Sequence, residues 1–442
     1  MQQTSNQQRR RVVVTGLGWI TPLGDDIETV WQKLIDGQSG VSKTELFDAA
    51  TFPSTFSAQV KNFDLTRYLG PDAKCHKDAS RNTLFALAAA KIAWNHARLD
   101  ETPSLDRTRV GIYLGGGEGP IDFDNFAAAA VAGWDPEANG GRGDLDARKW
   151  VDVAKQRLTA VREFEQDPNM AAGHIACLFK TQGPTFNTLT ACAASTQAMG
   201  EATALIRRGD ADVIISGGTH SMIHPFGVTG FNRLTALSTR NDTCQTASRP
   251  FDQTRDGFVL AEGAGMVILE EYEHAKKRGA TCLAEVVGYG STADAFRITD
   301  IHEEGRGGIA AMQQALDDAG LKTTNVDYIS AHGTGTEEND KIESLAIGKL
   351  FADRVKNVPV SSIKSMMGHL IAAAGAVEAI VCILAIRDHK VPPTTNYTTP
   401  DPNCPLDYVP NKARDVDVEI ALSNSFGFGG QNNTIIIKRV ED

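Results

Sequence analysis

The chain contains 442 residues, of which 41% are hydrophobic and 22% are charged, and its formal net charge is −11. This length exceeds one ordinary hydrophobic core, so we expect two fused units or one large α/β enzyme domain. Because the charge is negative and no long basic block interrupts it, the sequence argues against broad nucleic-acid binding. An acidic partner protein would have to dock on a local basic patch, since the overall field repels it.

Seven cysteines are scattered along the chain without CxxC spacing. This pattern argues against a disulfide framework and against a structural zinc site. It favours a reduced, cytoplasmic setting.

The first ten residues, MQQTSNQQRR, are polar, and we predict a disordered tail over 1–10. The following VVVTGLGWITPLG is too short and too interrupted by Gly and Pro for a signal peptide. The most apolar helix is expected over 371–386, but it contains Gly375 and Glu378 and is too short to span a bilayer. We therefore predict a helix buried inside a large protein and no membrane segment.

In the first part of the chain, short apolar strands alternate with helices, and glycine often follows the strands. Residues 121–165 differ because they carry little strand signal, and we expect an excursion with its own helix near 146–164. In chain order, the predicted elements are strand 12–15, helices 29–36 and 83–97, strands 110–114 and 185–190, helix 193–208, strands 211–215 and 266–270, and helix 273–278.

A second series begins near Cys282, and its order resembles that of the first. DVIISGGT (212–219) corresponds to EIALSNSF (419–426), and a reactive segment before an Ala-rich helix holds Cys192 in one half and Lys364 in the other. This weak repeat favours duplicated, helix-covered sheets, with halves at 11–280 and 281–442. The second series comprises strand 284–290, helix 308–319, strand 327–331, helix 340–351, strand 358–362, helix 375–387 and strand 419–423.

Cys192 lies in TACAAS, between a short apolar run and the helix predicted to begin at Ala193. A thiol at a helix N-terminus lies near the positive end of the helix dipole, which favours the thiolate. Free backbone N–H groups at the same place can hold an oxyanion. The alternative reading is a small buried residue without a chemical role.

Two histidines and a lysine also follow predicted strands. His332 lies in AHGTGT, and Lys364 and His369 lie in KSMMGHL. Considered alone, each histidine would be interpreted as a structural residue and Lys364 as an exposed loop residue. Together with the thiol they suit thioester chemistry, in which the thiol carries an acyl group and the imidazoles stabilise an oxyanion. We therefore expect a carbon–carbon bond-forming acyltransferase.

Asp340 and Glu343 lie three residues apart, so they share one face of the predicted helix over 340–351. They are candidate partners of Lys364, and the alternative is a solvated turn.

Rival motifs fail. Thr21 stands where a dinucleotide fingerprint after the GLG of 16–18 would need its third glycine, and the GGGEGP of 115–120 breaks the same pattern. His220 and His224 lie four residues apart, but Pro225 and the lack of a third ligand argue against a metal site. The sequence has no GxSxG elbow of a serine hydrolase.

From Arg11 to Arg439, except for 121–165, the chain resembles elongating β-ketoacyl-[acyl-carrier-protein] synthases, and most closely their type II branch. The resemblance implies a thiolase-like fold of two related halves in α/β/α/β/α layers, a homodimer, acyl carrier protein as partner, and no redox or nucleotide cofactor. It leaves open whether a structural monovalent ion is bound. The segments that carry it are TACAAS, GFNRLTALSTRND, RPFDQTRDGFVLAEGAG, AHGTGT, KSMMGHLIAAAGAVE and NSFGFGG.

The resemblance also implies roles for the marked residues. Cys192 takes the acyl chain, and the N–H groups of Cys192 and Phe428 hold the tetrahedral oxyanion. His332 and His369 stabilise the enolate formed when malonyl-carrier protein loses carbon dioxide. Phe428 is expected to gate the site. Lys364 is expected to orient the histidines with Glu343 as its ion-pair partner, and Asp340 and Phe426 are supporting residues.

Carrier-protein docking is expected on a basic cluster. Its members are Lys74, Lys77 and Arg81, with Arg233 and Arg240 as further candidates.

Glu118 stands where the family often has a branched apolar residue lining the acyl pocket, and a carboxylate there would disfavour a long alkyl chain. Together with the long segment 121–165, it motivates a rival reading, a ketosynthase of a polyketide or unusual acyl pathway. A third reading, a non-condensing subunit that only measures chain length, conflicts with the presence of Cys192.

Overall fold

Ten strands form one mixed sheet in the order β12-β11-β15-β16-β10-β1-β9-β8-β4-β7. The computed structural model describes residues 9–117, 122–297 and 301–441. The strands are β1 (Val12–Ile20), β4 (Val110–Gly116), β7 (Thr185–Thr188), β8 (Val213–His220), β9 (Gly263–Glu271), β10 (Ala284–Ala293), β11 (Tyr328–Ser330), β12 (Val360–Ser361), β15 (Ile420–Gly427) and β16 (Gln431–Lys438).

The sheet is duplicated. β7, β4 and β8 are parallel, and β9 and β1 follow antiparallel. β12, β11 and β15 repeat this arrangement with β16 and β10. The two sets join where β1 pairs with β10. The predicted correspondence of 212–219 with 419–426 is confirmed, since these segments form the equivalent strands β8 and β15.

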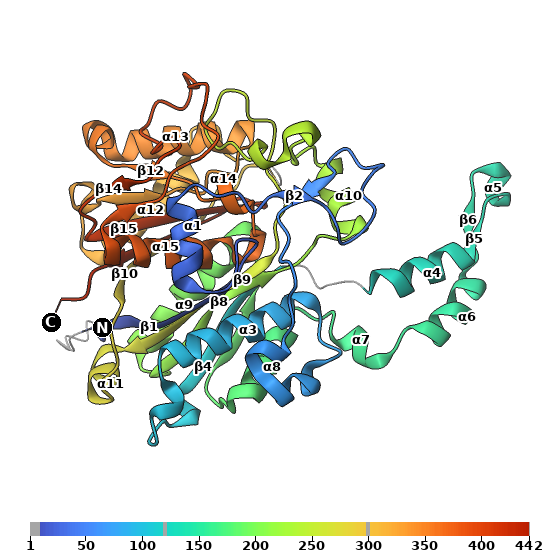
Figure 1. Ribbon diagram of the computed structural model, residues 1–442, viewed down its shortest axis with the longest axis horizontal. Coiled ribbons are helices and arrows are strands. Elements are labelled where there is room, and N and C mark those ends of the chain that lie inside the picture. The colour runs from blue at the N-terminus through green and yellow to red at the C-terminus, as the bar shows by residue number, and fades with distance from the viewer. Residues whose placement is uncertain (1–8, 118–121, 298–300, 442) are drawn as a thin grey trace.

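Helices cover the sheet in layers, with α9 and α15 between the two halves (Figure 1). On the outer faces, α3 and α8 pack against the first half, and α12 and α13 pack against the second. The main helices are α1 (Ile27–Ile35), α3 (Arg81–His96), α8 (Met170–Phe179), α9 (Ala194–Arg208), α10 (Pro225–Arg233), α11 (Tyr272–Lys277), α12 (Arg306–Ala319), α13 (Glu337–Phe351) and α15 (Ala374–Asp388), with the short α2 (Thr66–Leu69) and α14 (Lys364–Met367).

Glycines let the outer helices approach the sheet closely. A Cβ atom at Gly18 of β1 would lie 2.2 Å from the Ala89 carbonyl of α3. In the second half, a Cβ atom at Gly290 of β10 would lie 2.0 Å from the Ala311 carbonyl of α12. Both approaches exclude any side chain, since real Cβ contacts are not this short. β1 extends to Ile20, well past the predicted 12–15, because Gly16 continues the strand where α3 packs against it and does not begin a turn.

In the middle layer, α15 is apolar along almost its whole length. Residues 374–386 of α15 are all buried, and the one carboxylate among them is Glu378. No helix in the described part of the chain has both the length and the apolar character needed to cross a bilayer.

Residues 122–164 form an arm that extends from the rest of the molecule (Figure 1). The single helix predicted near 146–164 is wrong in detail, because the chain breaks at Leu158 and Thr159 caps a new helix. The arm contains α4 (Phe123–Gly133), α5 (Ala138–Gly141), α6 (Ala147–Arg157) and α7 (Ala160–Phe164), and β5 (Trp134–Asp135) pairs with β6 (Asp144–Leu145). Two further pairs are β2 (Ser42–Lys43) with β3 (Phe56–Ser57) and β13 (Lys390–Val391) with β14 (Arg414–Asp415).

The expected disordered tail covers 1–10, of which residues 1–8 lie outside the described ranges. The structure differs from the prediction at the last two residues. Arg9 contacts Asp318, and Arg10 contacts Asp212, each at 2.6 Å. These ion pairs hold Arg9 and Arg10 against the fold.

Candidate active site

Cys192 lies on a single 3-10 turn, 191–193, between β7 and α9. Ala191 has φ +47, a left-handed conformation that is costly for a residue with a side chain. The second half repeats this geometry, since Ile371 has φ +46 and begins the 3-10 turn 371–373 before α15. The counterpart of Cys192 is therefore Ala372, at an offset of 180 residues (372 − 192), and the predicted correspondence with Lys364 is wrong.

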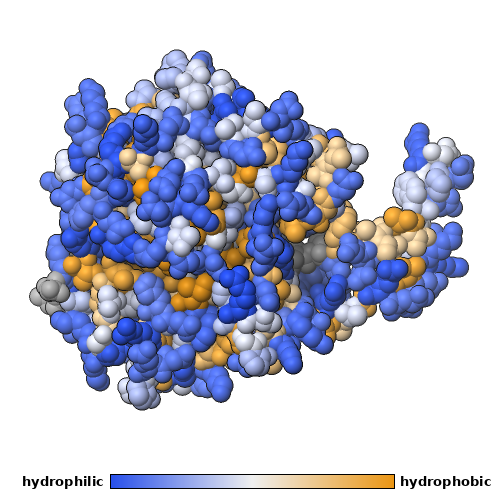
Figure 2. Space-filling model, in the orientation of Figure 1, coloured by the Kyte–Doolittle hydropathy of each residue, from blue (hydrophilic) through white to orange (hydrophobic). Residues whose placement is uncertain are grey.

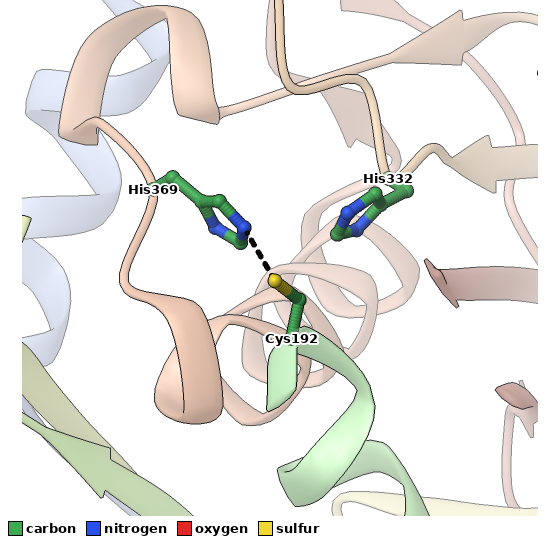
Figure 3. A group of neighbouring side chains, drawn as sticks. All are labelled: Cys192, His332 and His369. Carbon is green, nitrogen blue, oxygen red and sulfur yellow. Dashed lines mark hydrogen bonds between the residues drawn. The ribbon is translucent and has the colours of Figure 1, made fainter. Parts of the chain in front are cut away.

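Three reactive side chains from both halves meet at this point (Figure 3). His369 Nε2 lies 3.0 Å from Cys192 Sγ. The rings of His332 and His369 are 5.3 Å apart and nearly perpendicular. All three side chains are buried, with at most 4% of each residue exposed. The structure thus brings together the thiol and the two imidazoles that the sequence marked.

Hydrogen bonds assign the tautomers of both histidines. The N–H of Ile371 donates to His369 Nδ1 at 3.3 Å, so the ring proton of a neutral His369 lies on Nε2. Lys364 Nζ lies 3.5 Å from His332 Nδ1 and donates to it, which leaves the proton of His332 on Nε2 as well. Each imidazole therefore presents an N–H donor at its other nitrogen.

Both imidazoles are held neutral. Burial lowers the pKa of His332 well below its ordinary value of 6.5, and the neighbouring Lys364 lowers it further. Burial and Lys364 lower the pKa of His369 in the same way. Neutral imidazoles are good hydrogen-bond donors and poor sources of a full proton, which suits stabilisation of an oxyanion.

Lys364 is fixed by its own contacts. It is 2% exposed, donates to the His332 carbonyl at 2.6 Å and forms an ion pair with Glu378 of α15. The predicted ion pair with Glu343 is therefore wrong. Sequence reasoning missed Glu378, although a carboxylate in an otherwise apolar helix was the available signal.

Glu343 and Asp340 instead hold the backbone that carries His332. Glu343 accepts hydrogen bonds from the N–H groups of His332 and Gly333 at 2.8 and 2.7 Å. Asp340 accepts from the N–H groups of Thr334 and Gly335. Burial raises the pKa of Glu343 to about 7 and raises that of Asp340. Both carboxylates hold the loop in place and therefore act on the reacting atoms through His332.

The backbone of the turn between β15 and β16 lies close to Cys192. A Cβ atom at Gly427 would lie 3.2 Å from the Cys192 nitrogen and 2.8 Å from the Thr190 carbonyl, so only glycine leaves this space open. Phe428 follows and is 38% exposed, and Gly429 and Gly430 after it have positive φ. Phe426 is buried, with its ring 6.0 Å from that of His332.

A cavity of about 460 Å³ leads to these groups. The buried residues that line it include Cys192, His332 and His369, and Phe428 lines it as an exposed residue. Asp256, Glu337 and Glu338 are exposed lining residues, so they lie toward solvent. Cys192 also belongs to an apolar cluster, whose other members are Ile223, Val228, Phe231, Leu237, Phe258, Leu260 and Ile371.

Other marked residues lie outside the site. Arg81 contacts the buried Glu262 at 2.6 Å and holds two segments of the fold together, and its role in docking stays a prediction. Arg240 lies 3.4 Å from Asp256. Lys74, Lys77 and Arg233 are exposed, while Glu118 lies outside the described residues.

A thiol beside two neutral imidazoles, on the seam of a duplicated α/β fold, defines a condensing acyltransferase of the thiolase-like type. The family descriptions "Beta-ketoacyl synthase, N-terminal domain" and "Beta-ketoacyl synthase, C-terminal domain" match residues 9–275 and 283–398. The chain belongs to the beta-ketoacyl synthase family.

Curated relatives and solved structures agree with this assignment. The chain is 40% identical to 3-oxoacyl-[acyl-carrier-protein] synthase 2 of Coxiella burnetii, over 98% of this chain and 100% of the relative. It is also 40% identical to the enzyme of the same name from Staphylococcus aureus, over 98% and 99%. A beta-ketoacyl synthase structure from Burkholderia phymatum matches with a TM-score of 0.86 and 32% identity, over 98% and 100%. A type II polyketide ketosynthase, solved with its acyl-carrier protein and bound to a hexaketide, matches with a TM-score of 0.85 and 35% identity, over 98% and 100%.

Proposed function

We propose that this protein elongates acyl chains in fatty acid synthesis, by decarboxylative condensation of malonyl-carrier protein with an acyl group held on Cys192. The observation that carries the proposal is the 3.0 Å approach of His369 Nε2 to Cys192 Sγ beside the second neutral imidazole of His332.

In the first half-reaction, the Cys192 thiolate attacks the thioester carbonyl of the acyl-carrier protein. A carbon–sulfur bond forms to Cys192, and the carrier's thiolate leaves and takes up a proton. The N–H groups of Cys192 and Phe428 hold the intermediate oxyanion, an assignment supported by the open space in front of the Cys192 nitrogen.

In the second half-reaction, malonyl-carrier protein enters the same cavity. Its carboxylate leaves as carbon dioxide, and the electron pair of the broken carbon–carbon bond passes to the thioester as an enolate. The Nε2–H groups of His332 and His369 donate to the enolate oxygen. The enolate carbon then attacks the acyl-Cys192 carbonyl and expels the Cys192 thiolate, which releases a β-ketoacyl chain on the carrier.

Phe428 is proposed as the gate to the acyl-chain side. Its partly exposed ring lines the cavity, and Gly427 and Gly429 on either side give its backbone freedom to turn. Lys74, Lys77 and Arg233 are proposed to receive the acidic carrier protein, because they are exposed cations on a chain of net charge −11.

A homodimer is proposed from two unpartnered features. Strand β7 is the edge of the sheet, and Phe186 and Leu189 are 48% and 52% exposed there. The arm exposes a further apolar set, and apolar surface is visible on the arm in Figure 2. A second copy pairing at β7 would cover both features. The arm set comprises Phe126, Val131, Trp134, Leu145, Val151, Val161 and Phe164.

A cytoplasmic location is proposed as well. All seven cysteines lie in the described part of the chain, and none is in a disulfide there. Free thiols, including two exposed ones, fit a reducing compartment.

Intact-protein mass spectrometry tests the reaction. The protein is incubated with acyl-carrier proteins of graded chain length, and Cys192→Ala is compared with Cys75→Ala, which removes an exposed thiol elsewhere. We expect one acyl adduct in the unaltered protein and in the control, none in Cys192→Ala, and a β-ketoacyl product when malonyl-carrier protein is added. An adduct that survives in Cys192→Ala would contradict the proposal.

The second candidate is a ketosynthase of a specialised polyketide or unusual acyl pathway. The long arm favours it, because the arm contacts α10, a helix that contributes Val228 and Phe231 to the apolar cluster around Cys192. The ring centroids of Phe123 in the arm and Phe226 of α10 are 6.4 Å apart. Chain-length profiling separates the two. Efficient use of ordinary medium and long saturated chains supports fatty acid elongation, and their rejection supports the second candidate.

A further inference from the structure

The outer end of the active-site cavity is acidic. Asp256, Glu337 and Glu338 line it and are exposed. Among the described residues lining the cavity, Arg255 is the one arginine or lysine. Burial and Lys364 keep His332 and His369 neutral, so they add no positive charge. A thioester must therefore pass this carboxylate rim to reach Cys192.

Arg255 does not neutralise the rim. Its side chain is 3% exposed and donates inward, to the carboxylate of Asp401 at 2.6 Å and to the backbone carbonyls of Thr336 and Glu337 at 3.0 and 2.9 Å. With these partners the guanidinium is fixed below the surface, away from an incoming phosphate.

The three rim carboxylates are not equally compensated. Asp256 lies 3.4 Å from the Arg240 guanidinium. Glu337 and Glu338 have no cation within 4.0 Å in the described ranges of the chain, so their charges act on whatever enters. We call this pair the rim glutamates.

Stabilisation of the α13 helix dipole does not by itself explain why the rim glutamates lie at the cavity. The rim glutamates lie in the first turn of α13, where acidic residues stabilise the helix dipole. However, Asp340 of the same turn already accepts hydrogen bonds from Thr334, Gly335 and Phe251. Without the rim glutamates, the positive end of this 15-residue helix would attract phosphate groups at the cavity. With them, the same helix end repels anions.

We propose that Glu337 and Glu338 act as a charge filter that discriminates against coenzyme A thioesters in favour of carrier-protein thioesters. The inference rests on the proposed function and deepens it. A carrier-protein arm brings one phosphodiester to the rim, whereas coenzyme A brings a diphosphate and a further phosphate on its ribose. Repulsion grows with ligand charge. A carrier protein can offset its smaller penalty through contacts outside the cavity, for which the exposed Arg233 beside the lining residue Leu234 is available.

The test compares Glu337→Gln/Glu338→Gln with a matched control, Glu101→Gln/Glu273→Gln. The control changes the net charge by the same amount at two exposed glutamates that do not line the cavity. Condensation is measured with an acyl and malonyl pair on the carrier protein, and with the same pair on coenzyme A. The readout is the ratio of kcat/KM for the carrier pair to kcat/KM for the coenzyme A pair.

We expect this ratio to fall about threefold to tenfold in the rim variant at low ionic strength, and the difference to shrink in about 1 M salt. The control should keep the ratio of the unaltered protein. An unchanged ratio in the rim variant, an equal fall in the control, or a fall that persists in high salt would overturn the filter.

Failure of the filter is distinguishable from failure of the proposed function. If the unaltered protein condenses carrier-bound substrates and the ratio does not respond to the rim variant, only the filter is wrong. If the unaltered protein condenses neither pair, the proposed function is wrong and the filter falls with it. Thermal unfolding of both double variants measures any stability lost when acidic residues are removed from the first turn of α13. Such a loss does not change the ratio of the two kcat/KM values, because both are measured on the same preparation.

Discussion

Lys364 and Glu378 form an ion pair in which neither side chain is more than 2% exposed. The pair joins α14 to the central helix α15 and directs the ammonium group at the backbone and ring of His332. Burying two charges is expensive unless each is well satisfied, so such a pair points to a positional role more than to stability.

Replacement of Lys364 tests this positional role. In Lys364→Met, His332 loses the donor on Nδ1, so its proton is no longer confined to Nε2. We expect malonyl decarboxylation to fall by about a hundredfold, the usual order for loss of one preorganised donor. Carbon dioxide release measures this step, and acylation of Cys192, followed by mass spectrometry, should fall much less. Lys277→Met, an exposed lysine on α11, is the control.

The pH dependence of stability should report the buried carboxyls. Burial raises the pKa of Glu343 and of Glu378 from 4.5 to about 7. At these two carboxyls the folded protein therefore binds more protons than the unfolded chain, and their contribution to stability falls as the pH rises through this window. This contribution is on the order of a few kcal/mol, and below pH 6.5 the neutral His332 and His369 contribute with the opposite sign.

Thermal unfolding between about pH 4.5 and 7.5 measures it. In Glu378→Gln the decline should be shallower, because one of the two titrating groups is gone. An unaltered slope in that variant would show that Glu378 does not titrate in this range.

Each imidazole can be removed separately. In His332→Ala and in His369→Ala, one enolate donor is lost, and we expect the rate of malonyl decarboxylation to fall by about 10²- to 10³-fold. Because both groups donate to the same oxygen, the double variant should lose less than the product of the single effects. Fully multiplicative losses in a cycle of the four proteins would show that the two histidines act on separate steps.

Gly427 should be irreplaceable. A side chain there would meet the Thr190 carbonyl and the Cys192 nitrogen, so Gly427→Val should abolish acylation of Cys192. Gly348→Ala is the control, since a Cβ atom at that helical position meets nothing within 4 Å and should be neutral or stabilising by about 0.5–1 kcal/mol. Normal acylation in the valine variant, with its fold retained, would refute the proposed oxyanion site.

The fold class and the family were predictable because local signals and chemistry agreed. Apolar runs ending in glycine marked the strands, and the thiol and both imidazoles followed strands whose ends the fold brings together. The correspondence of β8 with β15 was also visible, since their residues match in order.

What the sequence left out depends on long-range geometry. Glu343 and Glu378 were equally plausible partners for Lys364 by residue type, and only the packing of α15 against the site selects Glu378. Arg81 looked like part of a basic surface, but its partner Glu262 lies far along the chain. The counterpart of Cys192 was misplaced because Ala372 has no reactive group to draw attention. The division at 280/281 and the roles assigned to the site residues stay predictions.

The first half contributes the thiol on the 3-10 turn 191–193, and the second half contributes both imidazoles, after β11 and before the 3-10 turn 371–373. Neither half contains a complete set of reacting groups, so each fragment expressed alone would be inert. Activity should return only when the fragments reassociate along α9 and α15. Condensation activity therefore measures how well the two halves are assembled.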